Sequence, residues 1–309
     1  GGWAFGFFNR WYPDVDDTSV VVMALDAVDL PDNTVKRNAV ARAVAWITSM
    51  QCKAGGWGAF DKDNDQDWLN AMPFGDLKAM IDPNTADVTA RVLEMAGRLG
   101  ASGCKDNVGL LPAREVLERG MAYLRGEQEA EGCWFGRWGV NYIYGTSGAM
   151  VALAALAGKE HEEEIGRGAR WLVEVQNEED GGWGETSLTY DIVAARAAGA
   201  RAGPVKKGRM EGDEESGSTA SQTAWAIIGL LAAGEATGRY EMEAIERGVD
   251  FLLRTQRGDG SWQERSFTGT GFPGHFYLRY HYYAQHFPLT ALSRYRLACL
   301  HHHRHHQSS

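Results

Sequence analysis

The chain contains the segment Trp171-Leu172-Val173-Glu174-Val175-Gln176-Asn177-Glu178-Glu179-Asp180-Gly181-Gly182-Trp183, and the pattern of this segment recurs along the sequence. An aromatic residue lies five positions before a Gln, and a short loop then leads to Gly-Gly-Trp or Gly-x-Trp. Glycine lets a helix end and the backbone turn, while Trp offers a large apolar surface with one hydrogen-bond donor. Such spaced recurrence is typical of repeat architectures. The copies end at Trp57, Trp134, Trp183 and Trp262, and Gly1-Gly2-Trp3 has the form of the tail of a fifth copy.

The stretches between these copies predict two kinds of helix. Helices of the first kind are amphipathic and charged, which suits an outer layer; they are expected at 37–51, 112–128, 161–176 and 241–256. Helices of the second kind are small and apolar nearly all round, which suits an inner layer; they are expected at 18–25, 85–99, 146–158, 219–233 and 289–300. The sequence therefore predicts an all-α fold of about nine helices and no strands, arranged in hairpins as an α/α toroid (an α6/α6 barrel).

One barrel domain is expected over residues 1–298, incomplete at its N-terminus because Gly1-Gly2-Trp3 begins inside a copy of the repeat. Residues 186–218 are rich in Gly, Ala, Arg and Glu and lack apolar periodicity, so we expect a loop or disorder there. Residues 299–309 carry five histidines and are expected to form a flexible tail.

Charge and cysteine usage exclude several classes of protein. The net charge of −10 and the scarcity of basic clusters argue against a nucleic-acid partner, for which a positive stripe is expected. The cysteines are widely spaced and form no CxxC pair, so neither a zinc site nor a disulfide framework is indicated. No apolar run reaches the roughly 18 residues that span a bilayer.

The stretch Tyr12-Pro13-Asp14-Val15-Asp16-Asp17-Thr18 places three carboxylates directly before an apolar run, where a helix is expected to begin. One interpretation is capping, because Asp at a helix start satisfies free backbone N–H groups and suits the helix dipole. Another is an acid catalyst, because crowded carboxylates cannot all ionise freely and one of them can keep its proton. A third is a metal site, since Asp-rich motifs often bind cations.

A second group of candidate residues is aromatic. Seven aromatic residues lie among the sixteen between Phe272 and Phe287, and they form either a packing stripe or a wall of π-faces along a cavity. Such faces attract cations by about 0.5–2 kcal/mol each. A proton donor beside an apolar, aromatic cavity would suit the protonation of an alkene and the guidance of the resulting carbocation. The pattern Gly269-x-Gly271-x-x-Gly274 is not interpreted as a phosphate site, because no strand is expected before it and Pro273 stands where a helix should start.

These motifs together resemble those of the squalene–hopene cyclases, the bacterial class II triterpene cyclases. The resemblance rests on Asp14-Val15-Asp16-Asp17, on the Gln…Gly-x-Trp copies, on residues 135–142 and on residues 269–283. It implies that Asp16 is the general acid that protonates squalene, that Asp14 and Asp17 hold and polarise it, and that no cofactor or metal is needed. Arg91 stands where many members have a His that supports the acid. The cation-stabilising or cavity residues implied are Phe5, Phe60, Trp138, Tyr144, Phe272, Phe276, Tyr280 and Tyr283.

The resemblance also implies the surroundings of the protein. The expected partners are squalene or a similar linear terpene and a lipid bilayer, with monotopic association at the cytoplasmic face of a bacterial membrane, and a homodimer is suggested. The chain resembles only the catalytic barrel, so we expect the 309 residues alone to be inactive. The alternatives are a class II cyclase of another linear terpene and a non-catalytic α/α-toroid binding module.

Overall fold

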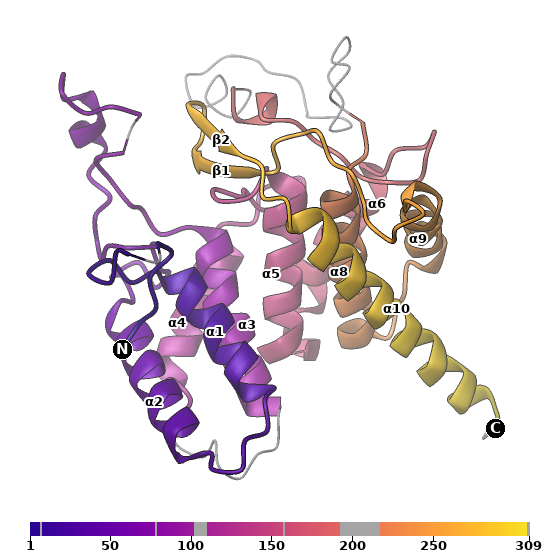
Figure 1. Cartoon of the computed structure of the whole chain (residues 1–309), viewed down its shortest axis with the longest axis horizontal. Coiled ribbons are helices and arrows are strands. Elements are labelled where there is room, and N and C mark those ends of the chain that lie inside the picture. Colours follow the sequence, from indigo (N-terminus) through magenta and orange to yellow (C-terminus); the bar gives the residue numbers. More distant parts are fainter. Residues whose placement is uncertain (7, 78, 102–109, 157, 192–216, 308–309) are drawn as a thin grey trace. The chain divides into compact units, whose positions relative to one another are not determined.

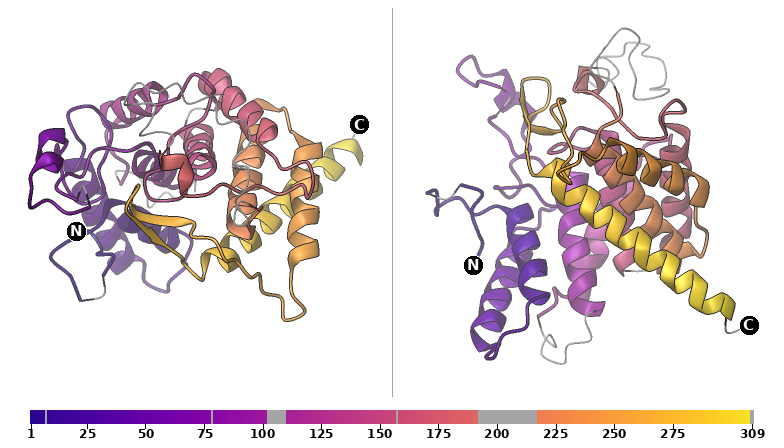
Figure 2. Two further views of the ribbon diagram at one scale, coloured as in Figure 1. Left: turned by 90° about the horizontal axis from the view of Figure 1, so that it is seen from above. Right: turned by 45° about the vertical axis from the view of Figure 1, so that its right-hand side comes forward.

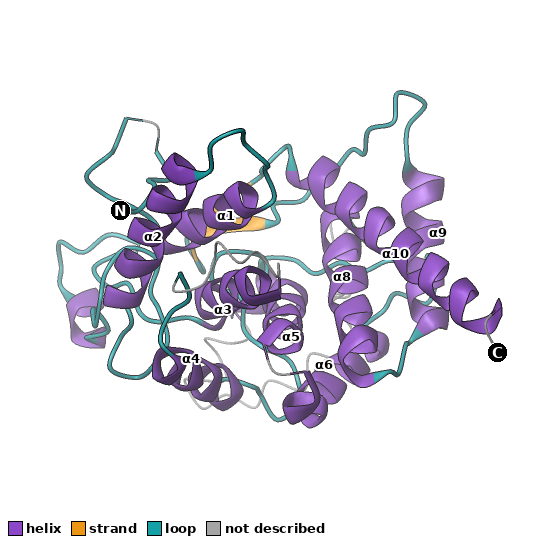
Figure 3. Ribbon diagram, turned by 90° about the horizontal axis from the view of Figure 1, so that it is seen from below, coloured by secondary structure: helices purple, strands orange, loops and turns teal. Residues whose placement is uncertain are grey.

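The computed structural model describes the chain except for residues 7, 78, 102–109, 157, 192–216 and 308–309. The described residues form two compact units, one from residues 1–128 with 155–158 and the other from residues 129–154 with 159–309. The regular secondary structure of each unit is mainly helical, and long loops connect the helices (Figure 3, purple and teal). Most of residues 186–218, where a loop or disorder is expected, lie outside the described part of the chain.

The helices follow the predicted ranges closely. In the first unit they are α1 (Val15–Asp26), α2 (Thr34–Ser49), the short 3-10 helix η1 (Asp67–Ala71), α3 (Ala86–Ala101) and α4 (Arg114–Gly126). The second unit contains most of α5 (Tyr142–Leu156), then η3 (Gly158–His161), α6 (Glu162–Glu174), α8 (Ala220–Thr237), α9 (Met242–Thr255) and α10 (Tyr283–Gln307). Each of the nine expected helices is present among the described residues (Figure 1).

The repeated Trp joins each loop to an inner helix. In four copies the Trp backbone N–H donates to a Thr hydroxyl in the first turns of the next inner helix, whereas that of Trp262 donates to Gln285 Oε1 at 3.3 Å. In three copies the buried indole N–H donates to a carbonyl of the preceding outer helix. These hydrogen bonds join the loop to its neighbouring helices and are largely shielded from water. The Trp–Thr pairs are Trp3 with Thr18 (2.8 Å), Trp57 with Thr89 (3.0 Å), Trp134 with Thr146 (3.0 Å) and Trp183 with Thr223 (2.9 Å). The indole acceptors are the carbonyls of Ile47 (2.8 Å), Leu172 (2.7 Å) and Leu252 (2.8 Å).

The expected inner layer is confirmed for three helices and only in part for two. In α3, α5 and α8 most side chains are buried, and in α8 burial is unbroken from Ala220 to Gly234. By contrast, α1 exposes Val20, and α10 exposes Leu289, Leu297 and Leu300. Among the described helices, α1 packs mainly on α2 and α3, and α10 packs mainly on α8. None of the helices in the described parts of the chain is long and apolar enough to cross a membrane.

The prediction that strands are absent is wrong for one short hairpin. Strands β1 (Gly269–Phe272) and β2 (Phe276–Leu278) pair antiparallel, with Gly269 opposite Leu278 and a register irregularity between Thr270 and Phe272. The glycine pattern at 269–274 is thus the hairpin itself, and Gly274 adopts a positive φ of 80° in its turn. The sequence obscured these strands because each has only three or four residues, too few to show a period of two.

The structure also differs from the expected flexible tail, since residues 299–307 continue α10 to Gln307 (Figure 2, yellow). No Gly or Pro interrupts the sequence between Leu289 and Gln307, so nothing in the backbone ends the helix earlier.

Candidate active site

The three aspartates lie at the start of α1, and the predicted capping role belongs to Asp14. Asp14 is the N-cap, extended at φ −108° and ψ 134°, and its Oδ1 accepts the backbone N–H of Asp17 at 2.8 Å. Its own backbone N–H donates to the Trp3 carbonyl at 2.7 Å, which ties the helix start to the first repeat loop. Asp16 and Asp17 follow in the first turn. The repeat loop and the cap therefore fix where the acids stand.

Burial also makes two of these carboxyl groups unusual acids. It raises the pKa of Asp14 from 3.8 to about 8, with Asp16 and Asp17 adding like-charge repulsion, although the N–H of Asp17 opposes the shift. It raises the pKa of Asp17 from 3.8 to about 6, and the Asp16 charge adds to this. Asp14 is therefore mostly protonated near neutral pH, and capping and acid chemistry are combined in one motif.

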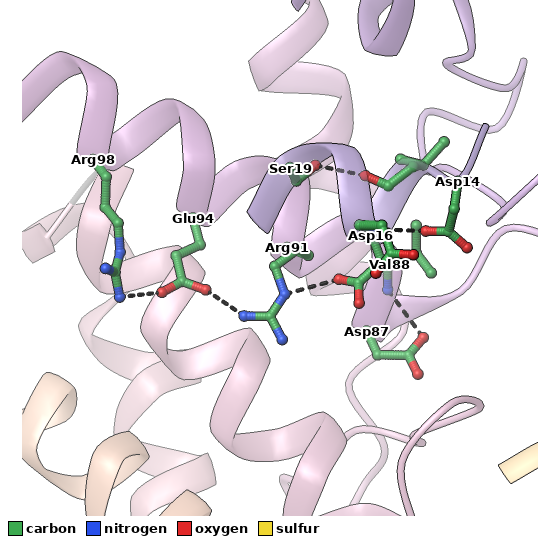
Figure 4. Close-up of polar contacts among 10 residues, drawn as sticks. Asp14, Asp16, Ser19, Asp87, Val88, Arg91, Glu94 and Arg98 are labelled. Carbon is green, nitrogen blue, oxygen red and sulfur yellow. Dashed lines mark hydrogen bonds and ion pairs between the residues drawn. The ribbon is translucent and has the colours of Figure 1, made fainter. Parts of the chain in front are cut away.

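Asp16 lies in a line of alternating charges that runs along α3 (Figure 4). Arg91 Nε donates to Asp16 Oδ1 at 2.8 Å, and Arg91 Nη1 donates to Glu94 Oε2 at 2.9 Å. Arg98 Nη2 donates to Glu94 Oε1 at 2.5 Å. Glu94 is buried, so both of its oxygens are held in fixed directions and Arg91 is held in turn.

This arrangement assigns different roles to the two oxygens of Asp16. Arg can only donate hydrogen bonds, so Oδ1 of Asp16 acts as an acceptor, and a proton carried by this carboxyl group would have to be on Oδ2. The Asp16 side chain is 33% exposed, whereas Asp14, the N-cap residue, is buried. Of these two acids, Asp16 is thus the one that a substrate can reach.

Two of the predicted aromatic residues belong to the same unit as the aspartates. Phe60 is half-buried in the loop after Trp57, and its backbone N–H donates to Asp82 Oδ2 at 2.6 Å. Phe5 lies between Trp3 and the aspartates and is 61% exposed. Val15 N–H donates to the Ala59 carbonyl at 2.8 Å, so the loop that carries Phe60 is attached to the start of α1.

The second unit gathers three of the predicted aromatic residues around a buried Trp. Tyr144 from α5 meets Trp225 from α8 edge-on, with ring centroids 4.9 Å apart. Tyr283 lies 5.8 Å from the same Trp and 4.7 Å from Tyr280, and Phe287 lies 5.3 Å from Trp225. We call Tyr144, Trp225, Tyr280, Tyr283 and Phe287 the aromatic cluster.

The aromatic residues between 272 and 287 do not all join one cluster among the described residues. Only Tyr280, Tyr283 and Phe287 enter the aromatic cluster. Tyr277 stacks on Tyr190 instead, and Tyr282 is 72% exposed and stacks on His286. The physical reason is that the short hairpin sends successive side chains to opposite faces, while only Tyr283 and Phe287 share a face of α10.

Two of the remaining predicted residues lie beside a buried cation. The Arg137 guanidinium is 4.7 Å from the ring centroid of Trp138 and 5.9 Å from that of Phe272. The Trp138 carbonyl accepts the N–H of Thr270, which holds this loop against β1 at 3.1 Å. Phe276 is separate from these rings and 46% exposed.

Sequence reasoning missed Trp225 and Glu94. Trp225 lies within an apolar inner helix, where its composition suggests ordinary packing; the aromatic spacing that drew attention to residues 272–287 has no counterpart there. Glu94 could have been found, because Arg91, Glu94 and Arg98 follow the i, i+3 and i+7 spacing that puts side chains on one face of a helix.

Comparison with known proteins decides the family. Residues 1–297 match the squalene-hopene cyclase C-terminal domain family. The chain belongs to this family. Its relatives include a dammaradiene synthase from the fern Dryopteris crassirhizoma, 61% identical over 301 residues, which are 94% of this chain and 42% of that protein. The squalene–hopene cyclase of Alicyclobacillus acidocaldarius is 45% identical over 298 residues, 96% of this chain and 42% of that protein.

The chain thus spans about two fifths of the length of the cyclases that it matches. A solved structure, the ent-copalyl diphosphate synthase from Streptomyces platensis, is 18% identical, covers 91% of this chain and 41% of that chain, and gives a TM-score of 0.59. That likeness supports the helical terpene-cyclase fold, and with the family it confirms the predicted all-α class of helical hairpins.

The repeat gives residues of different helices in this squalene–hopene cyclase family member corresponding positions. Asp14, Thr85 and Thr219 each donate their backbone N–H to the carbonyl of the preceding repeat Trp. Two positions later stand Asp16, Asp87 and Ser221, and the corresponding residue of α5 is Tyr144, two before the Trp134-bonded Thr146. The acid and a cluster tyrosine therefore occupy the same position of the repeat.

Proposed function

We propose that the full-length protein that contains this chain is a class II terpene cyclase that protonates squalene and cyclises it through carbocations. The observation that carries the proposal is the start of α1, where the buried Asp14, whose pKa is raised to about 8 by burial, adjoins a partly exposed Asp16 that Arg91 holds by one oxygen. Family membership and relatives at 61% and 45% identity support the class of reaction.

In this mechanism Asp16 donates the proton on Oδ2 to the terminal double bond, and the bond's electron pair forms the new C–H bond. The neighbouring carbon becomes cationic, and each further double bond attacks the cation in turn. Loss of a proton, or addition of water, ends the sequence. Asp14 and Asp17 keep protons available within the motif, and Arg91 holds Asp16 in one orientation.

The aromatic residues would stabilise the cations that form. Ring faces attract a cation by about 0.5–2 kcal/mol each, and more where water is excluded. Tyr144, Trp225 and Tyr283 are packed edge-to-face, which fixes the direction of each ring. We further propose that Phe5, Phe60, Trp138, Phe272, Phe276 and Tyr280 line the substrate cavity in the full-length protein.

The identity of the product is proposed less specifically than the class of reaction. Hopene is suggested by the name of the bacterial relative and dammaradiene by the name of the fern relative, and hopanol would form if water added to the last cation. The test is gas chromatography with mass spectrometry after the full-length protein has been incubated with detergent-dispersed squalene. We expect a cyclised product that matches one of these standards and disappears in Asp16→Asn. A folded protein that converts another linear terpene but not squalene would support the alternative substrate, and one that converts none would support a binding module.

We also propose that the full-length protein associates with the cytoplasmic face of a bacterial membrane and that it forms a homodimer. The membrane association follows from the proposed substrate, because squalene is a hydrocarbon that dissolves in a bilayer. Co-flotation of the full-length protein with phospholipid vesicles tests the first part, and sedimentation equilibrium tests the second. We also propose that these 309 residues alone do not turn over squalene, since α1 and α10 leave apolar side chains exposed to water.

A further inference from the structure

Two acids of the second unit occupy the same position of the repeat, and the proposed mechanism uses neither of them. Glu185 stands two residues after Trp183, and Glu264 stands two residues after Trp262. Glu185 accepts hydrogen bonds from the start of α5, and Glu264 accepts one from the start of α8. The repeat Trp of each loop donates its backbone N–H to the next inner helix, so each loop joins two successive inner helices.

The carboxyl group of Glu185 binds the N-terminus of α5. Its Oε1 accepts the backbone N–H of Asn141 at 2.9 Å and that of Ile143 at 2.5 Å. The residue is buried, which raises the pKa of Glu185 to about 7, and the N–H groups of Ile143, Asn141 and Tyr142 oppose the shift. The first N–H groups of an α-helix have no carbonyl partner within the helix, so Glu185 supplies from another loop the acceptor that a local cap would supply.

The backbone of Glu185 binds α8 at the same time. Its N–H donates to Gln222 Oε1 at 3.2 Å, and its carbonyl accepts Gln222 Nε2 at 2.9 Å. Gln222 Nε2 also donates to the Val140 carbonyl at 3.0 Å, just before α5 begins. Glu185 and Gln222 are both buried, and polar contacts in such surroundings are strong when satisfied and costly when broken. We call Glu185 and Gln222 the α5–α8 junction.

The ring pair of Tyr144 and Trp225 lies next to the α5–α8 junction along both helices. Tyr144 directly follows Ile143, and Trp225 stands three residues after Gln222. The Tyr144 ring also lies against Gly139, where a Cβ would overlap it. Because the two rings belong to different helices, the distance of 4.9 Å between their centroids depends on how the starts of α5 and α8 are held relative to each other.

The first unit contains a corresponding connection that uses no carboxyl group. Ala59 stands two residues after Trp57, and its backbone carbonyl accepts the N–H of Val15 at 2.8 Å. A carboxylate at residue 59 would add a like charge beside the aspartates at the start of α1. The helices that Glu185 and Glu264 bind have no acidic residue in their first turn. The acids thus occur at this repeat position where the helix start carries no aspartates, which favours a positioning role over proton donation.

We propose that Glu185 is a positioning residue that holds Tyr144 and Trp225 beside the cationic intermediates and thereby sets the share of fully cyclised product. This inference rests on the proposed function. Attraction between a ring and a cation requires the cation to lie close to the ring face. A cation that loses this attraction is more readily deprotonated: the electrons of a neighbouring C–H bond form a double bond, the proton passes to water, and cyclisation ends with fewer rings.

Analysis of the products that variants of the full-length protein form from squalene tests this proposal. Glu185→Ala removes the acceptor, whereas Glu185→Gln keeps an oxygen that can accept the same N–H groups. Gln176→Ala is the matched control, because Gln176 is buried in the same repeat copy but donates to the Ala244 carbonyl of the outer helix α9. We expect Glu185→Ala to raise the share of incompletely cyclised products roughly 2- to 30-fold, as loss of one ring-face attraction predicts. Glu185→Gln and Gln176→Ala should keep the wild-type share. Glu185→Asp, which shortens the side chain by one methylene, replaces Glu185→Ala if the latter does not fold, with the same direction expected.

Hydrogen–deuterium exchange of the same proteins separates the α5–α8 junction from the chemistry. In Glu185→Ala the backbone amides of residues 141–143 should exchange about tenfold faster than in the wild type, whereas Gln176→Ala should leave their rates unchanged. Unchanged exchange of these amides in Glu185→Ala would overturn the junction. Faster exchange with an unchanged share of products would overturn the positioning role. Absence of any cyclised product from the wild type would overturn the proposed function itself, and the exchange rates would still decide whether Glu185 holds α5.

Discussion

Replacing Asp14 by Asn should change how the stability of the protein depends on pH. Asn retains a side-chain oxygen that can accept the Asp17 N–H, so the cap of α1 survives. The substitution removes the titrating group whose pKa is raised to about 8 by burial. The variant therefore separates the titration of Asp14 from its structural role.

The sign and size follow from proton linkage. A carboxyl group whose pKa is higher in the folded state binds a proton in the folded protein before it does so in the unfolded chain. Its contribution to stability is fully present below pH 3.8 and is lost as the pH rises towards about 8. One pKa unit corresponds to about 1.4 kcal/mol, so the wild type should lose roughly 2.7 kcal/mol relative to Asp14→Asn between about pH 5 and 7.

Urea denaturation of the full-length protein at pH 5, 6 and 7 measures this difference. Asp29→Asn, at an exposed position after α1, is the control for removal of one negative charge. We expect the stabilities of wild type and Asp14→Asn to diverge with rising pH in favour of the variant, and those of wild type and Asp29→Asn to stay parallel. Parallel profiles for Asp14→Asn would refute the reasoning, because Asp14 would then have an ordinary pKa.

Three further substitutions test other parts of the account. Glu94→Gln removes the charge that holds Arg91, so we expect kcat for squalene to fall about tenfold, as loss of a charge-assisted hydrogen bond predicts. The control variant Glu118→Gln, at an exposed position, should leave kcat unchanged. Equal kcat values for the two variants would show that Glu94 does not position Arg91. Urea denaturation should show that Trp225→Ala lowers the free energy of unfolding by about 3–5 kcal/mol and that Trp225→Phe lowers it by less. Equal losses of unfolding free energy in the two variants would argue against edge-to-face packing at the centre of the aromatic cluster. Gly120→Ala should destabilise the protein by about 1–3 kcal/mol because the new Cβ meets the Trp57 ring. Gly126→Ala in the same helix places its Cβ in open space and should be neutral or stabilising. The opposite order of melting temperatures would contradict close packing of the Trp57 ring against α4.

The sequence was sufficient to predict the helices and the order of layers because the repeat marks every loop. Each Gln and Gly-x-Trp copy ends an outer helix, and the apolar composition of α3, α5 and α8 indicates their burial. The end helices α1 and α10 were also expected in the inner layer, but they expose apolar side chains such as Val20 and Leu289, which composition alone did not reveal. The hairpin β1–β2 escaped prediction because it is too short to show a period.

Local sequence pattern alone predicted the candidate site only where its residues are close in sequence, and Arg91 was singled out only by the resemblance to a known family. The sequence alone identifies Asp14, Asp16 and Asp17 as a group of acids at a helix start. Their pairing with Arg91, 75 residues from Asp16, depends on how α3 packs against α1, which no local pattern encodes. The division of residues 272–287 between the aromatic cluster, Tyr190 and the surface depends likewise on tertiary packing.

The measurement that tests the proposed reaction most directly is cyclisation of squalene by the full-length protein in heavy water. If Asp16 donates the initiating proton, its exchangeable hydrogen is deuterium under these conditions and ends up on carbon. Each cyclised hydrocarbon molecule should then carry one deuterium that does not exchange back, seen as a mass increase of about one unit, and Asp16→Asn should yield no product. Cyclised product without deuterium, or unchanged yield from Asp16→Asn, would contradict acid initiation at the start of α1.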